Sequence, residues 1–313
     1  MEKQSATNLS TLIKKYLKAN RRIEETTAKM TKRVFDYMID AVGDIGIGDF
    51  TIRQAELFQA SLVDRGLRRI SVNSYIKMAS PVFTWAIACG YIEVNPFAKL
   101  KKFKITRKKV QVFTPFEIER ILKCCPDDIW TARILLGLTS LRKGEVLNLT
   151  VDDVDFGNSV IYIQAKEETA YTWQWQPKDC QQRVLPLTSG LGDLLLKLYQ
   201  ELPSGQPYLL LKPRRYSFLL RNRDRLNDRI RKCPDNNFNR TFKNICQRAF
   251  ADGCFHMLRK TALTELTSGL RLQEVQELAG HSNIETTRSY LASRPDVLTR
   301  ANDILSRGVA QFG

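Results

Sequence analysis

Apolar residues in the first hundred positions recur every three or four residues, which is the spacing of one face of an α-helix. The last of these segments ends before Asn95-Pro96, where a helix stops because the residue before proline is forced out of helical geometry. The pattern predicts a helix that begins over Leu12 to Leu17 and further helices over Met30 to Val42, Thr51 to Arg65 (capped by Thr51) and Ser71 to Ala88. Residues 1–100 are therefore predicted to form an all-helical domain.

A second domain is predicted to begin at Thr114. Threonine at the N-cap, Pro115 at the first helical position and Glu117 at the third form a capping box that starts a helix. Helices are predicted over Pro115 to Cys124 and Trp130 to Leu138, strands over Val151 to Val154, Val160 to Gln164 and Arg183 to Leu187, a turn over Asp155 to Asn158, and helices from there to the C-terminus. Residues 114–313 are thus predicted to be mainly α-helical with one small antiparallel β-sheet, an α+β domain.

The net charge of the chain gives the strongest indication of its partner. Its 313 residues include 49 Lys and Arg against 33 Asp and Glu, a net charge of +16. Nucleic acid is the expected partner, because each cation that neutralises a phosphate releases condensed counterions. A basic run over residues 101–113 joins the two domains, and we expect a linker that also touches DNA through Lys101, Lys102, Lys104, Arg107, Lys108 and Lys109.

Other classes of protein fit the sequence less well. No apolar stretch approaches the roughly 20 residues of a membrane-spanning helix, and the first residues lack the apolar core of a secretory signal. Seven scattered cysteines without CxxC spacing are typical of a reducing compartment, and two histidines without clustered carboxylates do not suggest zinc. We therefore expect a cytoplasmic protein that uses no cofactor and no metal.

Candidate chemistry lies in the second domain. His256 and Arg259 are three residues apart on a predicted helix and share one face, and Arg142 and Glu145 have the same spacing. Two arginines are suited to clamp a phosphate and to stabilise a pentacoordinate transition state, because each guanidinium donates two hydrogen bonds to paired oxygens. A surface charge is the commoner interpretation of any one arginine, but the apolar helices around these two argue against it.

A tight turn is predicted between these helices and the C-terminus. Gly280 is suited to end one helix, and Ser282 with Glu285 forms a second capping box. His281 is then expected on the turn and Tyr290 on the helix that follows. A lone histidine is more often structural and a lone tyrosine more often packs, so only their combination with the arginines predicts attack of a tyrosine on a DNA phosphodiester.

The family signature of the tyrosine recombinases, or phage integrases, is an early Arg followed by HxxR, GH and Tyr, and this chain resembles it at Arg142, His256, Arg259, His281 and Tyr290. The segment HMLRKTALTELTSGLRLQEVQELAGHSNIETTRSYL is similar to the family's C-terminal boxes, TSLRKGEVLNLTVDDVD to its first box, and GLRRISVNSYIKMASPVFTWAIACGYIEVNP to its core-binding domain. The resemblance covers nearly the whole chain. It implies a helical SAM-like core-binding domain followed by a catalytic domain.

The family also uses a lysine from its small sheet, and two lysines here are candidates. Lys178 precedes the third strand at the family's usual offset, whereas Lys166 ends the second strand. The resemblance favours Lys178. The excursion between the two strands is longer than a tight turn, and we expect its alternating Tyr171, Trp173 and Trp175 to extend the hairpin and pack rather than to stack on DNA.

The resemblance implies a mechanism. Tyr290 attacks the scissile phosphate to form a 3′-phosphotyrosyl link, and Lys178 donates a proton to the leaving 5′-oxygen. His256 assists proton movement. The phosphate oxygens are assigned to Arg142, Arg259 and His281, with Glu145 in support. Lys260, where many members have His, and the lack of a His two residues beyond Tyr290 are departures at positions that the chemistry does not need.

The resemblance also implies partners. These are double-stranded DNA, a homotetramer assembled on two DNA sites, and accessory DNA-bending proteins. The two domains are expected to clamp the duplex mainly through phosphate contacts. Candidates for major-groove contact lie on the last N-terminal helix, although such residues also make a plain polar face: Ser71, Asn73, Ser74 and Lys77.

Several functions compete with integration or excision of a mobile element. An Xer-type resolvase of chromosome or plasmid dimers would use the same residues. A catalytically silent DNA-binding regulator would not need the intact set, and a type IB topoisomerase would relax supercoiled plasmid without a specific site. A Ser/His/Asp hydrolase is the least favoured, because the chain has no GxSxG motif and the charge would be unexplained.

Overall fold

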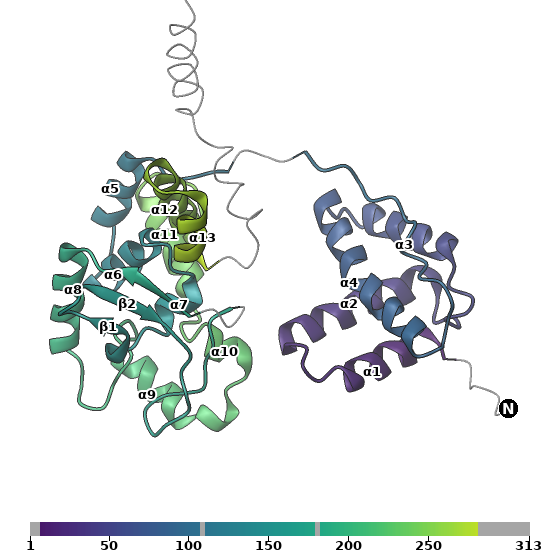
Figure 1. Ribbon diagram of the computed structural model, residues 1–313, viewed down its shortest axis with the longest axis horizontal. Helices are drawn as coiled ribbons and strands as arrows, with labels where there is room; N and C mark the ends of the chain where they lie inside the picture. Colours follow the sequence, from purple (N-terminus) through teal and green to yellow (C-terminus); the bar gives the residue numbers. More distant parts are fainter. Residues whose placement is uncertain (1–6, 107–109, 179–181, 281–313) are drawn as a thin grey trace, which may run out of the picture. The chain divides into compact units, whose positions relative to one another are not determined.

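The structure is a computed structural model, and it describes residues 7–106, 110–178 and 182–280. The chain divides into two compact units, Met1–Arg107 and Lys108–Gly313, each with its own hydrophobic core (Figure 1). The division into a domain over residues 1–100, a linker over 101–113 and a domain over 114–313, with the roles given to them, stays a prediction. Among the described residues, helices long and apolar enough to cross a membrane are absent.

The described part of the N-terminal unit forms four helices: α1 (Leu9–Ala19), α2 (Glu25–Val42), α3 (Ile52–Asp64) and α4 (Arg69–Ala88). The four predicted helices are thus confirmed. Helix α2 starts five residues earlier than predicted, because its first turns are polar and give no apolar pattern. Thr51 caps α3 as expected. Phe83 lies at the centre of the core, with ring centroids 4.9 Å from Phe50 and 5.2 Å from Phe97.

The first residues of the basic run lie against the N-terminal unit. The side chain of Asn73 on α4 donates to the backbone carbonyl of Phe103 at 2.8 Å and accepts from its backbone N–H at 3.0 Å. Gln59 on α3 donates to the carbonyl of Lys101 at 3.0 Å. The segment around Phe103 is therefore fixed to α3 and α4, and its exposed lysines have a defined place on this unit.

The described part of the C-terminal unit is mainly helical, which confirms the predicted fold class. Its helices are α5 (Pro115–Lys123), α6 (Asp128–Leu138), α7 (Lys143–Leu147), α8 (Ser189–Gln200), α9 (Pro213–Arg221), α10 (Asp228–Lys232), α11 (Phe238–Arg248), α12 (Phe255–Gly269) and α13 (Leu272–Ala279). Thr114 and Glu117 form the predicted capping box of α5. Helix α6 begins two residues before its predicted start, because Asp127 caps it by accepting from the N–H of Trp130 at 2.9 Å.

The small sheet is antiparallel in the order β1 (Val154–Asp155), β2 (Val160–Ile163) and β3 (Arg183–Pro186), with Ile161 opposite Leu185. The predicted first strand over Val151 to Val154 is wrong at its start. Val151–Asp153 is a 3₁₀ turn, because Asp153 accepts from both the N–H and the hydroxyl of Thr150, at 2.8 and 2.9 Å. This local side-chain bond competes with a strand for the same backbone.

Trp173 and Trp175 of the aromatic excursion between β2 and β3 pack into the unit, as expected, whereas Tyr171 is 55% exposed, so the prediction that it packs is wrong. Lys166 and Trp175 exchange two backbone hydrogen bonds of 2.8 and 3.1 Å, which extend the hairpin. Trp173 is 1% exposed, stacks on Tyr208 with centroids 4.0 Å apart, and donates from Nε1 to Asn148 at 2.9 Å. The excursion is therefore anchored to the residue that follows α7.

Helices α6 and α12 approach closely at Gly137. A Cβ added at Gly137 would lie 2.9 Å from Leu258 and 3.0 Å from Phe255 of α12, so only glycine fits this contact. Close packing here brings the end of α6, with Ser140 just beyond it, against the turn of α12 that carries Arg259. Two segments far apart in sequence are thus joined at one place.

Candidate active site

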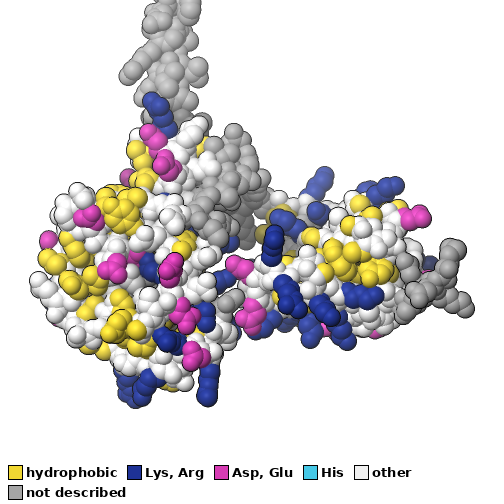
Figure 2. All heavy atoms as spheres, turned by 60° about the horizontal axis from the view of Figure 1, so that its bottom comes forward, with side chains coloured by type: hydrophobic (Ala, Val, Ile, Leu, Met, Phe, Trp, Pro, Cys, Tyr) yellow, Lys and Arg dark blue, Asp and Glu magenta, His cyan; other side chains and the backbone are white. Residues whose placement is uncertain are grey.

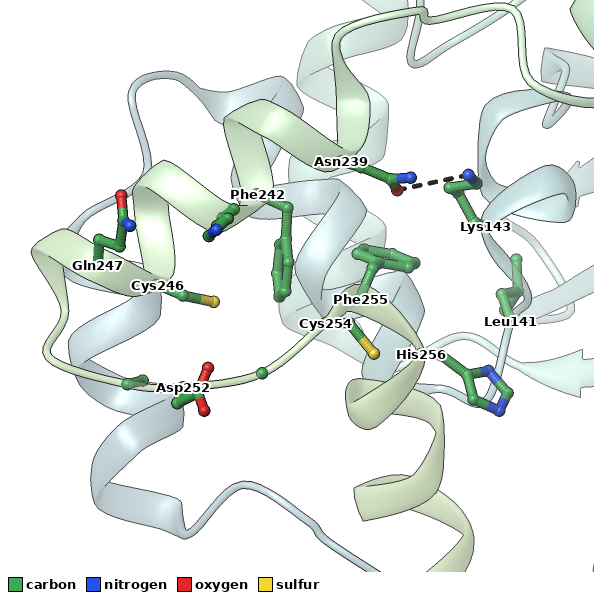
Figure 3. A pocket seen from close by; sticks show the side chains of 13 residues that line it. Leu141, Lys143, Asn239, Phe242, Cys246, Gln247, Asp252, Cys254, Phe255 and His256 are labelled. Carbon is green, nitrogen blue, oxygen red and sulfur yellow. Dashed lines mark hydrogen bonds between the residues drawn. The ribbon is translucent and has the colours of Figure 1, made fainter. Parts of the chain in front are cut away.

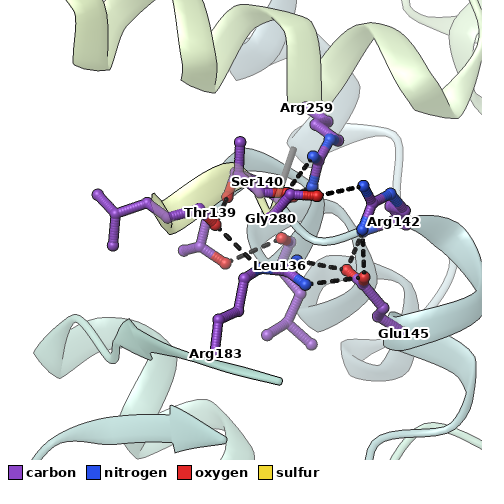
Figure 4. A network of polar contacts seen from close by, with 10 residues as sticks. Leu136, Thr139, Ser140, Arg142, Glu145, Arg183, Arg259 and Gly280 are labelled. Carbon is purple, nitrogen blue, oxygen red and sulfur yellow. Dashed lines mark hydrogen bonds and ion pairs between the residues drawn. The ribbon is translucent and has the colours of Figure 1, made fainter. Parts of the chain in front are cut away.

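The C-terminus of α13 is the point on which the arginines converge (Figure 4). The last carbonyls of any helix have no partner within it. Here the carbonyl of Leu278 accepts from Arg183 Nε at 2.9 Å, that of Ala279 accepts from Arg259 Nη2 at 2.5 Å, and that of Gly280 accepts from Arg142 Nη2 at 2.8 Å. Three consecutive carbonyls therefore hold three guanidinium groups, at the end of a helix where the dipole favours cations.

Arg259 is a core residue of the C-terminal unit. It is 1% exposed, and its Nη1 also donates to the carbonyl of Ser140. Ser140 has a φ of 73° and is fully buried, so its backbone takes an uncommon conformation just before Arg142. A simple surface charge is excluded for Arg259, because its guanidinium is bonded to buried carbonyls from two separate segments.

Arg142 shares the carboxylate of Glu145 with a residue of β3. Arg142 donates to Glu145 from its backbone N–H at 2.7 Å and from Nη1 at 3.0 Å, while Arg183 donates from Nη1 and Nη2 at 3.0 and 2.6 Å. Burial by itself raises the pKa of Glu145, but the hydrogen bonds and charge of Arg183, and then those of Arg142, outweigh it and lower the pKa. Glu145 is therefore an anion that orients two arginines.

His256 lies in the first turn of α12, at the edge of a pocket of about 480 Å³ (Figure 3). The side chain of His256 is exposed, but neighbouring protein atoms keep water from part of its ring, and this lowers the pKa of His256. The charges of Arg259, Lys260, Arg142 and Lys178 lower it further. The neutral imidazole is thus favoured. The positive charges of Arg259, Lys260, Arg142 and Lys178 therefore all act on His256.

The two candidate lysines have different surroundings. Lys178 is exposed, and its positive charge contributes to the lowered pKa of His256. Lys166 is 9% exposed in its side chain and forms an ion pair with Asp153, whose side chain is 2% exposed. Lys166 is therefore held by a buried carboxylate. The assignment of the sheet lysine stays a prediction.

Two of the predicted catalytic residues, His281 and Tyr290, lie outside the described residues. His281 directly follows in the sequence Gly280, whose carbonyl accepts from Arg142. Among the described residues, Arg142 and Arg259 thus meet at the end of α13, Glu145 binds Arg142, and His256 lies on α12 three residues before Arg259.

The predicted DNA contacts of the N-terminal unit are at its surface to different degrees. Ser74 and Lys77 are exposed, Ser71 and Asn73 are half-buried, and the amide of Asn73 is engaged with Phe103. Lys101, Lys102 and Lys104 are exposed, whereas Arg107, Lys108 and Lys109 lie outside the described residues. Lys and Arg side chains gather on the face of this unit seen in Figure 2. The DNA contacts stay predictions.

Arg183 is a site residue that the sequence did not reveal. It was expected only as the first residue of a strand, yet its side chain is 3% exposed and it contacts both Glu145 and α13. The one available signal was the alternation of Arg183-Val184-Leu185, which points Arg183 to the same buried face as Leu185. A charged residue at such a position requires a buried partner.

The site has the chemistry of an anion receptor. Groups of three or more His, Cys, Asp or Glu that would hold a metal are absent from the described part of the chain. The positive charges of Arg142, Arg259 and Lys178 instead act on His256, whose imidazole favours its neutral form. Guanidinium and ammonium groups are suited to bind the oxygens of a phosphate and to stabilise charge that develops on them.

Known proteins resemble this chain in sequence. A family model described as the phage integrase family matches residues 111–296. Tyrosine recombinase XerA of Thermococcus kodakarensis is 26% identical over 277 residues, which cover 87% of this chain and 88% of that protein.

Solved structures share the fold. The Tn1549 transposon integrase in complex with transposon right end DNA superposes with a TM-score of 0.74 at 19% identity, over 96% of this chain and 99% of that one. A lambda integrase tetramer bound to a Holliday junction gives a TM-score of 0.67 at 18% identity, over 92% of this chain and 78% of that one.

Proposed function

This chain belongs to the phage integrase family and is a tyrosine-type site-specific DNA recombinase, and we propose that it cuts and rejoins DNA through a 3′-phosphotyrosyl link to Tyr290. The observation that supports this chemistry is the convergence of Arg142, Arg259 and His256 beside the end of α13, ten residues before Tyr290 in the sequence. The arginines bind the scissile phosphate and stabilise the charge of its pentacoordinate transition state.

The proposed reaction moves two protons and exchanges one bond. The phenol oxygen of Tyr290 attacks the phosphorus while the bond from phosphorus to the 5′-oxygen breaks. His256, kept neutral by its surroundings, accepts the phenol proton, and Lys178 donates a proton to the leaving oxygen. Because the new phosphodiester keeps the energy of the old one, a 5′-hydroxyl from the partner strand reverses the step without ATP.

The proposed partner is double-stranded DNA, bound by a homotetramer across two sites. The lambda integrase tetramer on a Holliday junction, which shares the fold, supports this assembly. Basic side chains on the N-terminal unit and on residues 101–104 would supply phosphate contacts. Accessory DNA-bending proteins belong to the same proposal, as does action on DNA in the cytoplasm.

Two biological roles are compatible with this chemistry. We propose integration or excision of a mobile element, which the shared fold of the Tn1549 transposon integrase supports. Resolution of chromosome or plasmid dimers is the second candidate, because the relative XerA matches this chain along most of both sequences. The DNA site on which the enzyme acts distinguishes the two.

A trapping experiment tests the proposal. Purified full-length protein is incubated with a library of nicked duplexes, in which the cleaved strand end diffuses away and prevents rejoining. We expect a covalent adduct that is resistant to denaturation, and sequencing the trapped DNA gives the site. Tyr290→Phe, which removes only the phenol oxygen, is expected to bind DNA without forming the adduct.

The same experiment separates the alternatives. A trapped adduct with Tyr290→Phe would refute the nucleophile assignment. Binding without an adduct in the wild-type protein would indicate a silent regulator. Relaxation of supercoiled plasmid that lacks the trapped site would indicate a type IB topoisomerase.

A further inference from the structure

We propose that Arg183 is a positioning residue of this active site, which orients Arg142 through Glu145 and fixes the end of α13. The inference rests on the proposed function, because it concerns the arginines assigned to the scissile phosphate. Arg183 is buried on β3, and all three of its nitrogens are bonded to protein groups, so it is not expected to touch DNA.

Arg183 connects the three segments that carry the site. Its Nη1 and Nη2 bind both oxygens of Glu145, and its Nε binds the carbonyl of Leu278. All of its donor nitrogens are thereby committed, and a planar guanidinium bonded on two edges has no freedom to rotate. Through Arg183 the sheet therefore fixes α7 against α13.

The charges of this cluster explain why a second arginine is needed. Glu145 alone with Arg142 would form a neutral pair, in which the carboxylate competes with a phosphate for the guanidinium. Arg183 takes one hydrogen bond to each oxygen of Glu145, so the three side chains together keep one positive charge. Arg142, with 20% of its side chain exposed, is the member that can present this charge to a ligand.

The end of α13 is shaped around Arg183. Gly280 ends the helix with a φ of 58°, and a Cβ added there would lie 3.2 Å from Arg183 Cδ and 3.3 Å from Nη1. The same turn supplies the carbonyls that hold Arg142 and Arg259. A shift of Arg183 would therefore move the hydrogen-bond acceptors of both phosphate-binding arginines together.

The test compares two substrates that differ by one negative charge. A nicked duplex carrying the trapped site is made with either a phosphate or a methylphosphonate at the scissile position, and the rate of covalent adduct formation is measured. On the phosphate, Arg183→Met is expected to slow the reaction about 100-fold, the size of effect that small displacements produce. On the neutral methylphosphonate the loss is expected to fall below about tenfold, because less charge needs stabilising.

Arg142→Ala is the reference, and it is expected to show the same dependence on substrate charge. The matched control is Arg133→Met. Arg133 is also buried in the C-terminal unit, pairs with Asp235 at 2.9 Å and donates to the carbonyl of Leu210 at 2.7 Å, but it contacts none of the site residues among those described. Its replacement is expected to reduce both rates equally, as a purely structural change does.

Each outcome decides the proposal. Equal losses by Arg183→Met on both substrates, or none, would overturn the positioning role while leaving the recombinase assignment intact. Failure of the wild-type protein to form an adduct would overturn the proposed function and this inference with it. If Arg183→Met does not fold, Arg183→Lys, which keeps the charge but not the two-pronged geometry, is carried through the same comparison. Failure of both variants to fold would assign Arg183 a structural role and reject the proposal.

Discussion

The two units of this protein differ in their basic residues, because among the described residues only the C-terminal unit buries arginines. In the N-terminal unit the ion pairs are at the surface, as between Lys29 and Glu25, whose side chains are 71% and 41% exposed. In the C-terminal unit Arg133, Arg183 and Arg259 are at most 8% exposed, and each donates to backbone carbonyls. The described ion pairs of the N-terminal unit therefore lie at its surface, whereas charged side chains form part of the interior of the C-terminal unit.

The difference has an energetic meaning. An exposed ion pair contributes roughly 0–1 kcal/mol, because water screens it and the side chains lose entropy. A buried charge requires complete pairing, and removal of one partner leaves the other desolvated and uncompensated. We therefore expect the C-terminal unit to tolerate few changes at its arginines, while single lysines on the N-terminal unit change affinity without changing stability.

The largest expected effect separates two glutamates. Glu145→Ala leaves the buried guanidinium of Arg183 without its carboxylate and should lower the free energy of unfolding by about 4 kcal/mol. Glu25→Ala, which breaks an exposed pair, should cost about 0.5 kcal/mol. Denaturant unfolding of both variants measures the difference, and similar losses would contradict it.

A pair of glycines sharpens the comparison. Gly280→Ala and Gly66→Ala both place a side chain at positive φ, 58° and 75°, which costs about 1 kcal/mol. Only Gly280 also faces a neighbour, since its Cβ would meet Arg183, so its total should reach about 2–3 kcal/mol. Gly66 has open space around it. Thermal unfolding of the two variants tests the order, and adduct formation should fall only with Gly280→Ala.

The surface lysines should act on DNA affinity alone. Lys77→Ala and Lys102→Ala remove exposed charges, and each that contacts a phosphate should reduce the slope of log affinity against log salt by about 0.9. Binding to the trapped duplex, measured by fluorescence anisotropy over a range of salt, gives the slope. Lys123→Ala, which removes an exposed lysine paired with Glu119, is the control and should leave the slope unchanged. If the slope is unchanged in all three variants, Lys77 and Lys102 do not contact DNA phosphates.

The smallest effect concerns pH. Because the pKa of His256 is lowered in the folded protein, its contribution to stability is fully present above about pH 6.5, its unfolded value, and is lost as the pH falls toward the folded pKa. His256→Gln should therefore lose less stability than the wild type between pH 7.5 and pH 5.5. Thermal unfolding at the two values measures this, and an equal loss in both proteins would contradict the shift.

Sequence patterns predicted the helices well where amphipathic spacing and caps coincide. Thr114 and Glu117 mark the start of α5 unambiguously, and the structure has the same capping box. The prediction failed at Val151, where a side-chain bond between Asp153 and Thr150 makes a 3₁₀ turn out of an apolar, β-prone stretch. Such local competition depends on which bond forms, which periodicity does not encode.

For the candidate site, the sequence indicated which residue types were available. The spacing of His256 and Arg259, together with Arg142, pointed to phosphate chemistry and to the family. Arg183 was missed, because nothing in its local sequence says that its side chain would reach a carboxylate 38 residues away. Contacts of that kind arise only when β3 packs beside α7.

What the sequence by itself determined is the charge of the chain, the places where its helices begin, and the set of side chains able to handle a phosphate. These follow from local rules that act within a few residues. Only the tertiary structure decided that the carbonyls of Leu278, Ala279 and Gly280 each receive an arginine from a different segment. The physical reason is that a buried guanidinium must find all its acceptors at once, and the folded chain meets that condition at the end of α13.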